Sequence, residues 1–220
     1  MQKIQFTFDH FEKAKIPLLD SFKSTNKEID SILEFSHSQQ LGRNYVLSSY
    51  LQNRGVESVA SGLLWEVYYR NKAFKNPSQL CYAIGWKNEK SNWEISSPKG
   101  FKASIGNKDI SIIQGSAEHV ALFEGYFDFL SWRKINGSSV HPTAIILNSV
   151  SLVNRAVENM RKFNKIDLYL DNDEVGKQCT TLIKQAYPFA NDRSDIYTGF
   201  KDYNEMLMDS LRNVYSRKNR

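Results

Sequence analysis

Three short apolar runs in the second half of the chain each stop at a polar residue and lead into a segment with helical periodicity. The runs cover 120–123, 143–147 and 166–170, and the helical segments cover about 127–135, 152–163 and 175–187. Continuous runs rich in β-branched and aromatic residues are typical of strands buried on both faces of a parallel sheet. Strands that alternate with helices predict βαβ units. With a fourth strand expected at Asp195 to Thr198 and a last helix from Tyr203, the sequence predicts a four-stranded parallel sheet flanked by helices.

Residues before 115 have a different pattern. Helical segments are expected on either side of Asn53-Arg54-Gly55, and strand-like runs separated by turn residues follow at 63–70, 79–86 and 93–97. This order predicts a small α+β domain over residues 41–114 and an α/β domain over residues 115–220. Residues 1–40 lack clear periodicity, and we expect a linker or an arm there.

Acidic residues follow the predicted strands. Glu124 ends the first run, Asp171 and Asp173 follow the third, Asp202 follows the fourth, and Asp128 lies one helical turn after Glu124. Ligands of open α/β sheets bind outside the carboxyl ends of the strands, so these acids should gather at one edge. Crowded carboxylates recruit a cation, and hard oxygen ligands suit Mg²⁺ or Mn²⁺. The alternative is that these acids only cap helix amino termini.

The first domain combines basic and aromatic residues. Eight basic residues lie between Arg70 and Lys108, against Glu89 and Glu94, and five aromatic residues are interleaved with them, namely Phe74, Tyr82, Trp86, Trp93 and Phe101. Cations for the backbone and aromatic faces for the bases are typical of proteins that bind single-stranded nucleic acid. The alternative is a solvated sheet whose aromatic side chains point inward.

Composition excludes several other classes of protein. The two cysteines, Cys81 and Cys179, lack partners at zinc-ligand spacing, so a Cys-based metal site is excluded. They are expected to be reduced, as in an intracellular protein. No apolar segment approaches the roughly 20 residues that span a bilayer, and the amino terminus lacks the pattern of a signal peptide. We therefore expect a cytoplasmic protein without a membrane partner, and the net charge of +5 favours polyanionic partners.

Two motifs resemble the signature of the Toprim domain, a metal-binding module of bacterial primases, topoisomerases and several nucleases. They are Phe123-Glu-Gly-Tyr-Phe-Asp128 and Leu170-Asp-Asn-Asp-Glu-Val-Gly176, and both resemble the primase version more closely than the topoisomerase one. The Asn148-Ser149 pair resembles the middle loop of that domain. The whole chain is similar to the Toprim proteins of bacterial mobile elements and mobilisable plasmids.

This resemblance implies DNA primase-like nucleotidyl transfer that depends on Mg²⁺ or Mn²⁺. Glu124, Asp171 and Asp173 would be catalytic and bind the cation, with Asp128 and Asp202 in support. The implied partners are single-stranded DNA or an RNA/DNA primer-template, nucleoside triphosphates, and a helicase or other replication protein. The residues implied to contact nucleic acid or nucleotide are Lys99, Lys102, Lys108, Lys201, Asn148, Ser149 and Gly125.

The sequence departs from these relatives in one respect. They usually carry a Cys/His zinc finger that helps to choose the template, and these 220 residues contain none. The resemblance therefore implies the cation site but not independent primer synthesis. A Toprim-type nuclease and a non-catalytic nucleic-acid-binding module remain as alternatives. A haloacid-dehalogenase-like phosphatase also begins with Asp-x-Asp after an apolar strand, but too little chain follows Asp173 for that domain.

Overall fold

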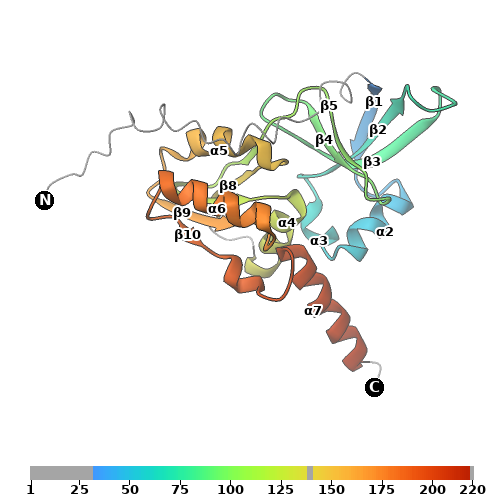
Figure 1. Cartoon of the computed structure of the whole chain (residues 1–220). Coiled ribbons are helices and arrows are strands. Elements are labelled where there is room, and N and C mark those ends of the chain that lie inside the picture. Colours follow the sequence, from blue (N-terminus) through green and yellow to red (C-terminus); the bar gives the residue numbers. More distant parts are fainter. Residues whose placement is uncertain (1–31, 138–140, 219–220) are drawn as a thin grey trace, which may run out of the picture.

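The computed structural model describes residues 32–137 and 141–218. They form two five-stranded sheets, with strand orders β1-β2-β3-β4-β5 and β10-β9-β7-β8-β6. Figure 1 shows the first sheet beside the second, with helix α7 extending away from both. Most of the predicted arm, residues 1–31, lies outside the described residues.

The first sheet is antiparallel throughout. Its strands are β1 (Leu33–Gln40), β2 (Trp65–Asn71), β3 (Leu80–Lys87), β4 (Trp93–Ser96) and β5 (Lys102–Ile105). Helices α2 (Tyr45–Asn53) and α3 (Glu57–Ala60) connect β1 to β2. The side chain of Asn44 begins α2 by accepting hydrogen bonds from the backbone N–H groups of Val46 and Leu47. These elements confirm the predicted helical pair and the three predicted strand-like runs.

Strand β1 corrects the expectation of a linker up to residue 40. It pairs with β2 over most of its length and carries a register shift between Phe35 and His37. An edge strand has one neighbour and an exposed face, so polar residues such as Gln39 and Gln40 fit it without the alternation that identifies a central strand. Its sequence therefore lacked a recognisable period.

The second sheet confirms the predicted α/β fold. Strands β7 (Ser116–Phe123), β8 (Pro142–Ile146), β9 (Lys165–Tyr169) and β10 (Asn191–Asp192) are parallel, and β6 (Ser111–Ile113) adds an antiparallel edge. Residues from both faces of β7, β8 and β9 belong to buried clusters. Burial on both faces explains why these strands are continuous apolar runs.

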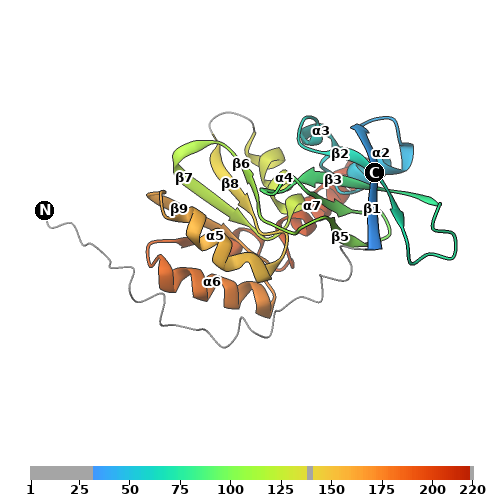
Figure 2. The ribbon, with the colours of Figure 1, turned by 90° about the horizontal axis from the view of Figure 1, so that it is seen from above.

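Helices cover both faces of this sheet, as Figure 2 shows for α5 and α6 on one side. The helical elements of this half are α4 (Tyr126–Asn136), η3 (Val150–Leu152), α5 (Val153–Met160), α6 (Glu174–Ala186), η4 (Ser194–Tyr197) and α7 (Tyr203–Lys218). Helices α5 and α6 pack on one face, and α4 and α7 pack on the other. The buried cluster under α4 and α7 also includes residues of α2 and α3 and two residues of β3. The two halves therefore share this apolar core.

The predicted fourth strand at Asp195 to Thr198 is wrong. These residues lie in the 3₁₀ turn η4, and the parallel edge strand is the two-residue β10 just before it. The buried Tyr197 donates its hydroxyl hydrogen bond to the carbonyl of Leu170, 2.7 Å away, which turns the chain across the end of β9. Its apolar neighbour Ile196 is exposed, so the run is not a buried strand.

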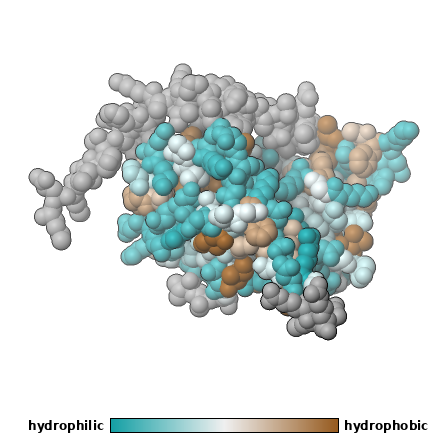
Figure 3. Space-filling view, turned by 60° about the horizontal axis from the view of Figure 1, so that its bottom comes forward, coloured by the Kyte–Doolittle hydropathy of each residue, from teal (hydrophilic) through white to brown (hydrophobic). Residues whose placement is uncertain are grey.

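The face of the molecule in Figure 3 is mainly hydrophilic, with small separate hydrophobic areas. None of the helices among the described residues combines the length and apolar character that crossing a bilayer requires.

Candidate active site

Two of the predicted catalytic acids meet at the carboxyl ends of neighbouring parallel strands. Glu124 follows β7 and Asp171 lies two residues after β9, and these strands pair directly. The Glu124 carboxylate (Oε2) accepts a hydrogen bond from the backbone N–H of Asp171 at 3.2 Å. The structure thus brings Glu124 against the loop that carries Asp171 and Asp173, although 47 residues separate Glu124 from Asp171 in the sequence.

Lys201 lies between the two aspartates of this loop. Its ammonium nitrogen is 3.4 Å from Oδ2 of Asp171 and 3.4 Å from Oδ2 of Asp173. The negative charge of Asp171 is the main reason that the pKa of Lys201 is raised. Since the Lys201 side chain is 58% exposed, it can move away without leaving a cavity. The ammonium group of Lys201 therefore already occupies the space between Asp171 and Asp173.

Burial and like charges raise the pKa values of the two innermost acids. Burial, followed by the charge of Asp171, raises the pKa of Glu124 to about 7. Burial and the charge of Asp202 raise the pKa of Asp171 to about 6. The pKa of Asp173 is lowered instead, first by the hydrogen bond from the backbone of Gly176 and also by Lys201. The pKa values of Glu124 and Asp171 therefore lie close to neutral pH, which is typical of functional acids.

Asp128 and Asp202, the two supporting acids, both accept hydrogen bonds from backbone N–H groups. Asp128 is buried and accepts a hydrogen bond at 3.1 Å from the backbone N–H of Asn204, near the start of α7. Burial raises the pKa of Asp128 well above its usual value, and the charges of Asp202 and Asp171 add to this. Asp202 accepts a hydrogen bond from the backbone N–H of Glu205 at 2.7 Å, as a helix cap does. The capping alternative is thus correct for Asp202 and compatible with its position near the other acids.

Asp173 likewise combines the two predicted roles. Its Oδ1 atom accepts the hydrogen bond of Gly176 N–H at 3.0 Å and so caps α6, while Oδ2 faces Lys201. Two glycines let the chain approach these acids closely. A Cβ at Gly176 would overlap the backbone carbonyl of Asp171, and one at Gly125 would lie 2.7 Å from the Asp128 carboxylate.

Asn172 is a positioning residue of the site that the sequence interpretation missed. Its backbone N–H donates to the carbonyl of Lys201 at 2.7 Å. Its side-chain amide donates to three carbonyls of the 194–200 segment, at 3.0–3.3 Å, namely those of Ser194, Tyr197 and Phe200. Asn172 therefore positions the segment that ends in Lys201. The signal was its place between two acids that alternate along an extended segment, because alternation points the middle side chain elsewhere.

The donor set fits a hard divalent cation. Within the described residues, no group of three or more His, Cys, Asp or Glu side chains is arranged to hold a metal ion as it stands. The ammonium group of Lys201 lies between Asp171 and Asp173 and neutralises them. Carboxylate oxygens that repel one another at a strand edge are the ligands that Mg²⁺ and Mn²⁺ prefer. The residues present thus fit such a cation, provided that Lys201 moves aside.

The residues predicted to contact nucleic acid are spread over both halves. Lys99 lies in the loop between β4 and β5, Lys102 begins β5, and Lys108 lies between β5 and β6. Lys99 and Lys102 are exposed, and Lys108 is half-buried. These lysines flank the first sheet, whereas Lys201 and Gly125 lie at the acids. The structure therefore does not gather the predicted set in one place.

Asn148 connects the two halves. Its side-chain oxygen accepts a hydrogen bond from the indole N–H of Trp86 at 3.0 Å, and its amide donates to the Asp109 carbonyl and the Ser111 hydroxyl at 2.8 and 2.9 Å. A φ of +59° places Asn148 in the left-handed region that asparagine tolerates. The neighbouring Ser149 shares a hydrogen bond with Ser151 at 3.0 Å. The Asn148 amide is thus already used within the protein.

Comparison with known families and structures agrees with this geometry. Residues 121–207 match the family described as Toprim-like, and residues 36–106 match a family described as a domain of unknown function (DUF8464). No curated protein matches the chain significantly. The second half of the chain therefore contains a Toprim-like segment, and a different family model matches the first half.

Two solved structures from bacteriophage T7 share the fold. The primase fragment of the T7 primase-helicase protein is 14% identical, with a TM-score of 0.50 over 79% of this chain and 71% of that one. A chain in the structure of the T7 lagging-strand DNA polymerase interacting with primase domains bound to an RNA/DNA hybrid and dTTP is 15% identical. Its TM-score is 0.52, over 81% of this chain and 90% of that one. The chain thus combines a Toprim-like segment with the fold of these two T7 chains.

Proposed function

We propose that this Toprim protein catalyses divalent-cation-dependent nucleotidyl transfer on nucleic acid, as a DNA primase does, in plasmid or mobile-element replication. The observation that carries the proposal is the cluster of Glu124 and Asp171, whose pKa values are raised to about 7 and about 6, next to Lys201. Acids that are difficult to ionise alone and a mobile ammonium group suit a site that exchanges a lysine for a metal ion and a phosphate.

The residues have separate roles in this proposal. Glu124, Asp171 and Asp173 would hold Mg²⁺ or Mn²⁺, and Asp128 and Asp202 would keep their loops in place. When bound, the cation would activate the primer 3′-hydroxyl and neutralise charge on the leaving pyrophosphate. Lys201, released from the aspartates, would donate to a phosphate oxygen, while Asn172 keeps the Lys201 backbone against the site.

The proposed partners follow from the same chemistry. They are single-stranded DNA or an RNA/DNA primer-template and nucleoside triphosphates, with a helicase or another replication protein as a further partner in the cytoplasm. The T7 structure with primase domains, an RNA/DNA hybrid and dTTP supports this choice of ligands. The net charge of +5 also favours a polyanionic partner.

Labelled nucleotide incorporation on single-stranded DNA, with and without a preformed primer, tests the proposal. It should require Mg²⁺ or Mn²⁺, and Asp171→Asn should abolish it. Glu118→Gln, an exposed acid on β7, is the control and should leave it unchanged. Cleavage of the same DNA without incorporation would assign the site to a nuclease. DNA binding with neither reaction would assign the chain to a binding module.

Calorimetry of Mn²⁺ binding tests the cation site without turnover. We expect binding by the native protein and a large loss of affinity for Asp171→Ala, because that change removes a central carboxylate. Unchanged affinity in this variant would contradict the ligand assignment, whatever the incorporation assay shows.

A further inference from the structure

The first sheet lines an open pocket that is separate from the acids and from the core between the halves. Its volume is about 620 Å³, which lies in the range of small-ligand sites. Each of the five strands contributes a lining residue, and these are Phe35, Trp65, Lys87, Trp93 and Ile105. The sheet curls so that β1 approaches β5, and the rings of Phe35 and Trp93 stack with centroids 6.0 Å apart.

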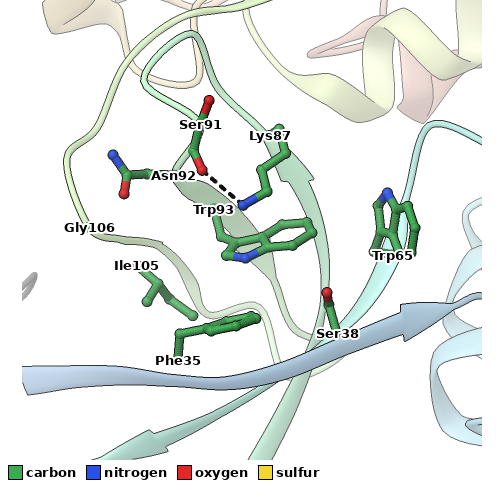
Figure 4. Close-up of a pocket in the computed structure, with 9 residues that line it drawn as sticks. All are labelled: Phe35, Ser38, Trp65, Lys87, Ser91, Asn92, Trp93, Ile105 and Gly106. Carbon is green, nitrogen blue, oxygen red and sulfur yellow. Dashed lines mark hydrogen bonds between the residues drawn. The ribbon is translucent and has the colours of Figure 1, made fainter.

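Aromatic surfaces dominate this pocket. Figure 4 shows Trp65 across an open space from Trp93 and Lys87, with Phe35 below Trp93. Trp93 is 7% exposed and forms the floor, whereas Phe35 and Trp65 are 43% and 36% exposed. Solvent-exposed aromatic rings can pack against the faces of a flat ligand. The polar residues Ser38, Ser91 and Asn92 complete the wall and can bind the edge of such a ligand.

Lys87 adds a positive charge to the pocket. Its ammonium nitrogen lies 3.8 Å from the centre of the Trp93 ring and donates to the carbonyl of Ser91 at 2.8 Å. Among the described residues, no acid forms an ion pair with Lys87. Partial burial lowers its pKa. An ammonium group has three donors, so Lys87 can still bind an anion.

The surrounding charge also favours an anion. Residues 87–108 contain five lysines and two glutamates, Glu89 and Glu94. Glu94 is buried and bonded to Asn88 and Ser104. Because Trp93 lines the pocket, alternation along β4 places the next residue, Glu94, on the other face of the sheet. Among the described residues that line the pocket, Lys87 is therefore the one that carries a charge.

We propose that this pocket binds one unpaired nucleotide of a single DNA strand, with the base packed against the exposed rings of Trp65 and Phe35 and the phosphate on Lys87. Aromatic faces suit every base, while a cation tracks the backbone. A base inside a duplex cannot enter, because its faces are covered by its neighbours. That the strand is DNA rests on the proposed function; the base-and-phosphate chemistry rests on the pocket.

Anisotropy titrations with labelled oligodeoxythymidine of about 12 nucleotides, a length within the usual site size, test this site. Trp65→Ala removes one stacking surface and should raise the dissociation constant by a factor of about 5 to about 100. Lys87→Met should reduce the slope of log K against log salt by about 0.7, the amount expected for one phosphate contact with a single strand. Blunt duplex DNA of the same length should compete poorly with the single strand.

Two control variants separate the pocket from general charge and hydrophobicity. Tyr45→Ala removes an aromatic side chain that is 84% exposed and outside the pocket, and Lys184→Ala removes an exposed lysine on α6. Both should bind like the native protein. If Trp65→Ala fails to fold, Phe35→Ala tests the other exposed ring. Native affinity and salt slope in Trp65→Ala and Lys87→Met, or preferred binding of oligouridine, would overturn the proposal.

Photocrosslinking locates the base directly and separates this proposal from the catalytic one. An oligonucleotide with 5-iododeoxyuridine should crosslink to peptides that contain Trp65 or Phe35, and crosslinks only elsewhere would contradict the site. Asp171→Asn should keep this crosslink while losing nucleotide incorporation. Pocket-dependent binding without incorporation by the native protein would refute the proposed function alone. Incorporation with native binding in the pocket variants would refute the pocket alone.

Discussion

Glu124→Gln should stabilise the protein at alkaline pH and leave its stability unchanged at acid pH. Burial and Asp171 raise the pKa of Glu124 from 4.5 to about 7. The folded state therefore holds a proton that the unfolded state releases, and stability falls as pH rises from about 4.5 to about 7. At about 1.4 kcal/mol for each pKa unit, the native protein loses about 3 kcal/mol by pH 8. Glutamine has no charge to bury and can still accept the Asp171 N–H bond.

Urea or thermal unfolding at pH 5 and at pH 8 measures this difference. For a chain of this length, about 3 kcal/mol corresponds to a rise of about 6–12 °C in the midpoint of Glu124→Gln at pH 8, with little change at pH 5. Mn²⁺ should stabilise the native protein at pH 8 and the variant much less. Glu118→Gln, an exposed acid on the same strand, is the matched control. Equal effects of Glu124→Gln at both pH values would refute the reasoning.

Three further substitutions test the parts of the site separately. Lys201→Met removes the cation that lies 3.4 Å from Asp171 and Asp173, so calorimetry should show Mn²⁺ binding several-fold tighter while nucleotide incorporation falls. Gly176→Ala adds a Cβ that overlaps the Asp171 carbonyl, and urea unfolding should show a loss of about 3 kcal/mol. Asn172→Ala removes three hydrogen bonds to the 194–200 segment, so hydrogen exchange there should accelerate and stability fall by about 1–3 kcal/mol.

The central strands could be predicted from the sequence, and the edges could not. Strands β7, β8 and β9 are buried on both faces, and that burial requires the continuous apolar runs that identified them. Strands β1, β6 and β10 lie at sheet edges, where one neighbour and partial exposure permit polar or very short segments. The run at Asp195 to Thr198 was wrongly predicted to be a strand, because it contains apolar residues but does not lie in the sheet. Its apolar residues serve a turn whose tyrosine is bonded to Leu170.

The acids of the site could be predicted because their position depends on topology alone. A residue after a parallel strand reaches the carboxyl edge of the sheet whatever its rotamer, and Glu124 and Asp171 do so. The bond from Asn172 to the 194–200 segment depends on how that segment folds back, which no periodicity reveals. The sequence predicted that Lys201 contacts a phosphate, whereas the structure places it between Asp171 and Asp173. That position depends on how the 194–200 segment folds.

Strand β3 links the aromatic pocket to the acids. Trp86 and Lys87 are consecutive in this strand, so their side chains leave opposite faces of the sheet. Lys87 lines the pocket, while the ring of Trp86 packs against that of Tyr126, tilted by 31° with centroids 4.7 Å apart, and its indole N–H donates to Asn148. Tyr126 begins α4 two residues after Glu124. A DNA strand bound at Lys87 would therefore be connected through buried side chains to the start of α4, so the first sheet can set the distance from the bound nucleotide to Glu124.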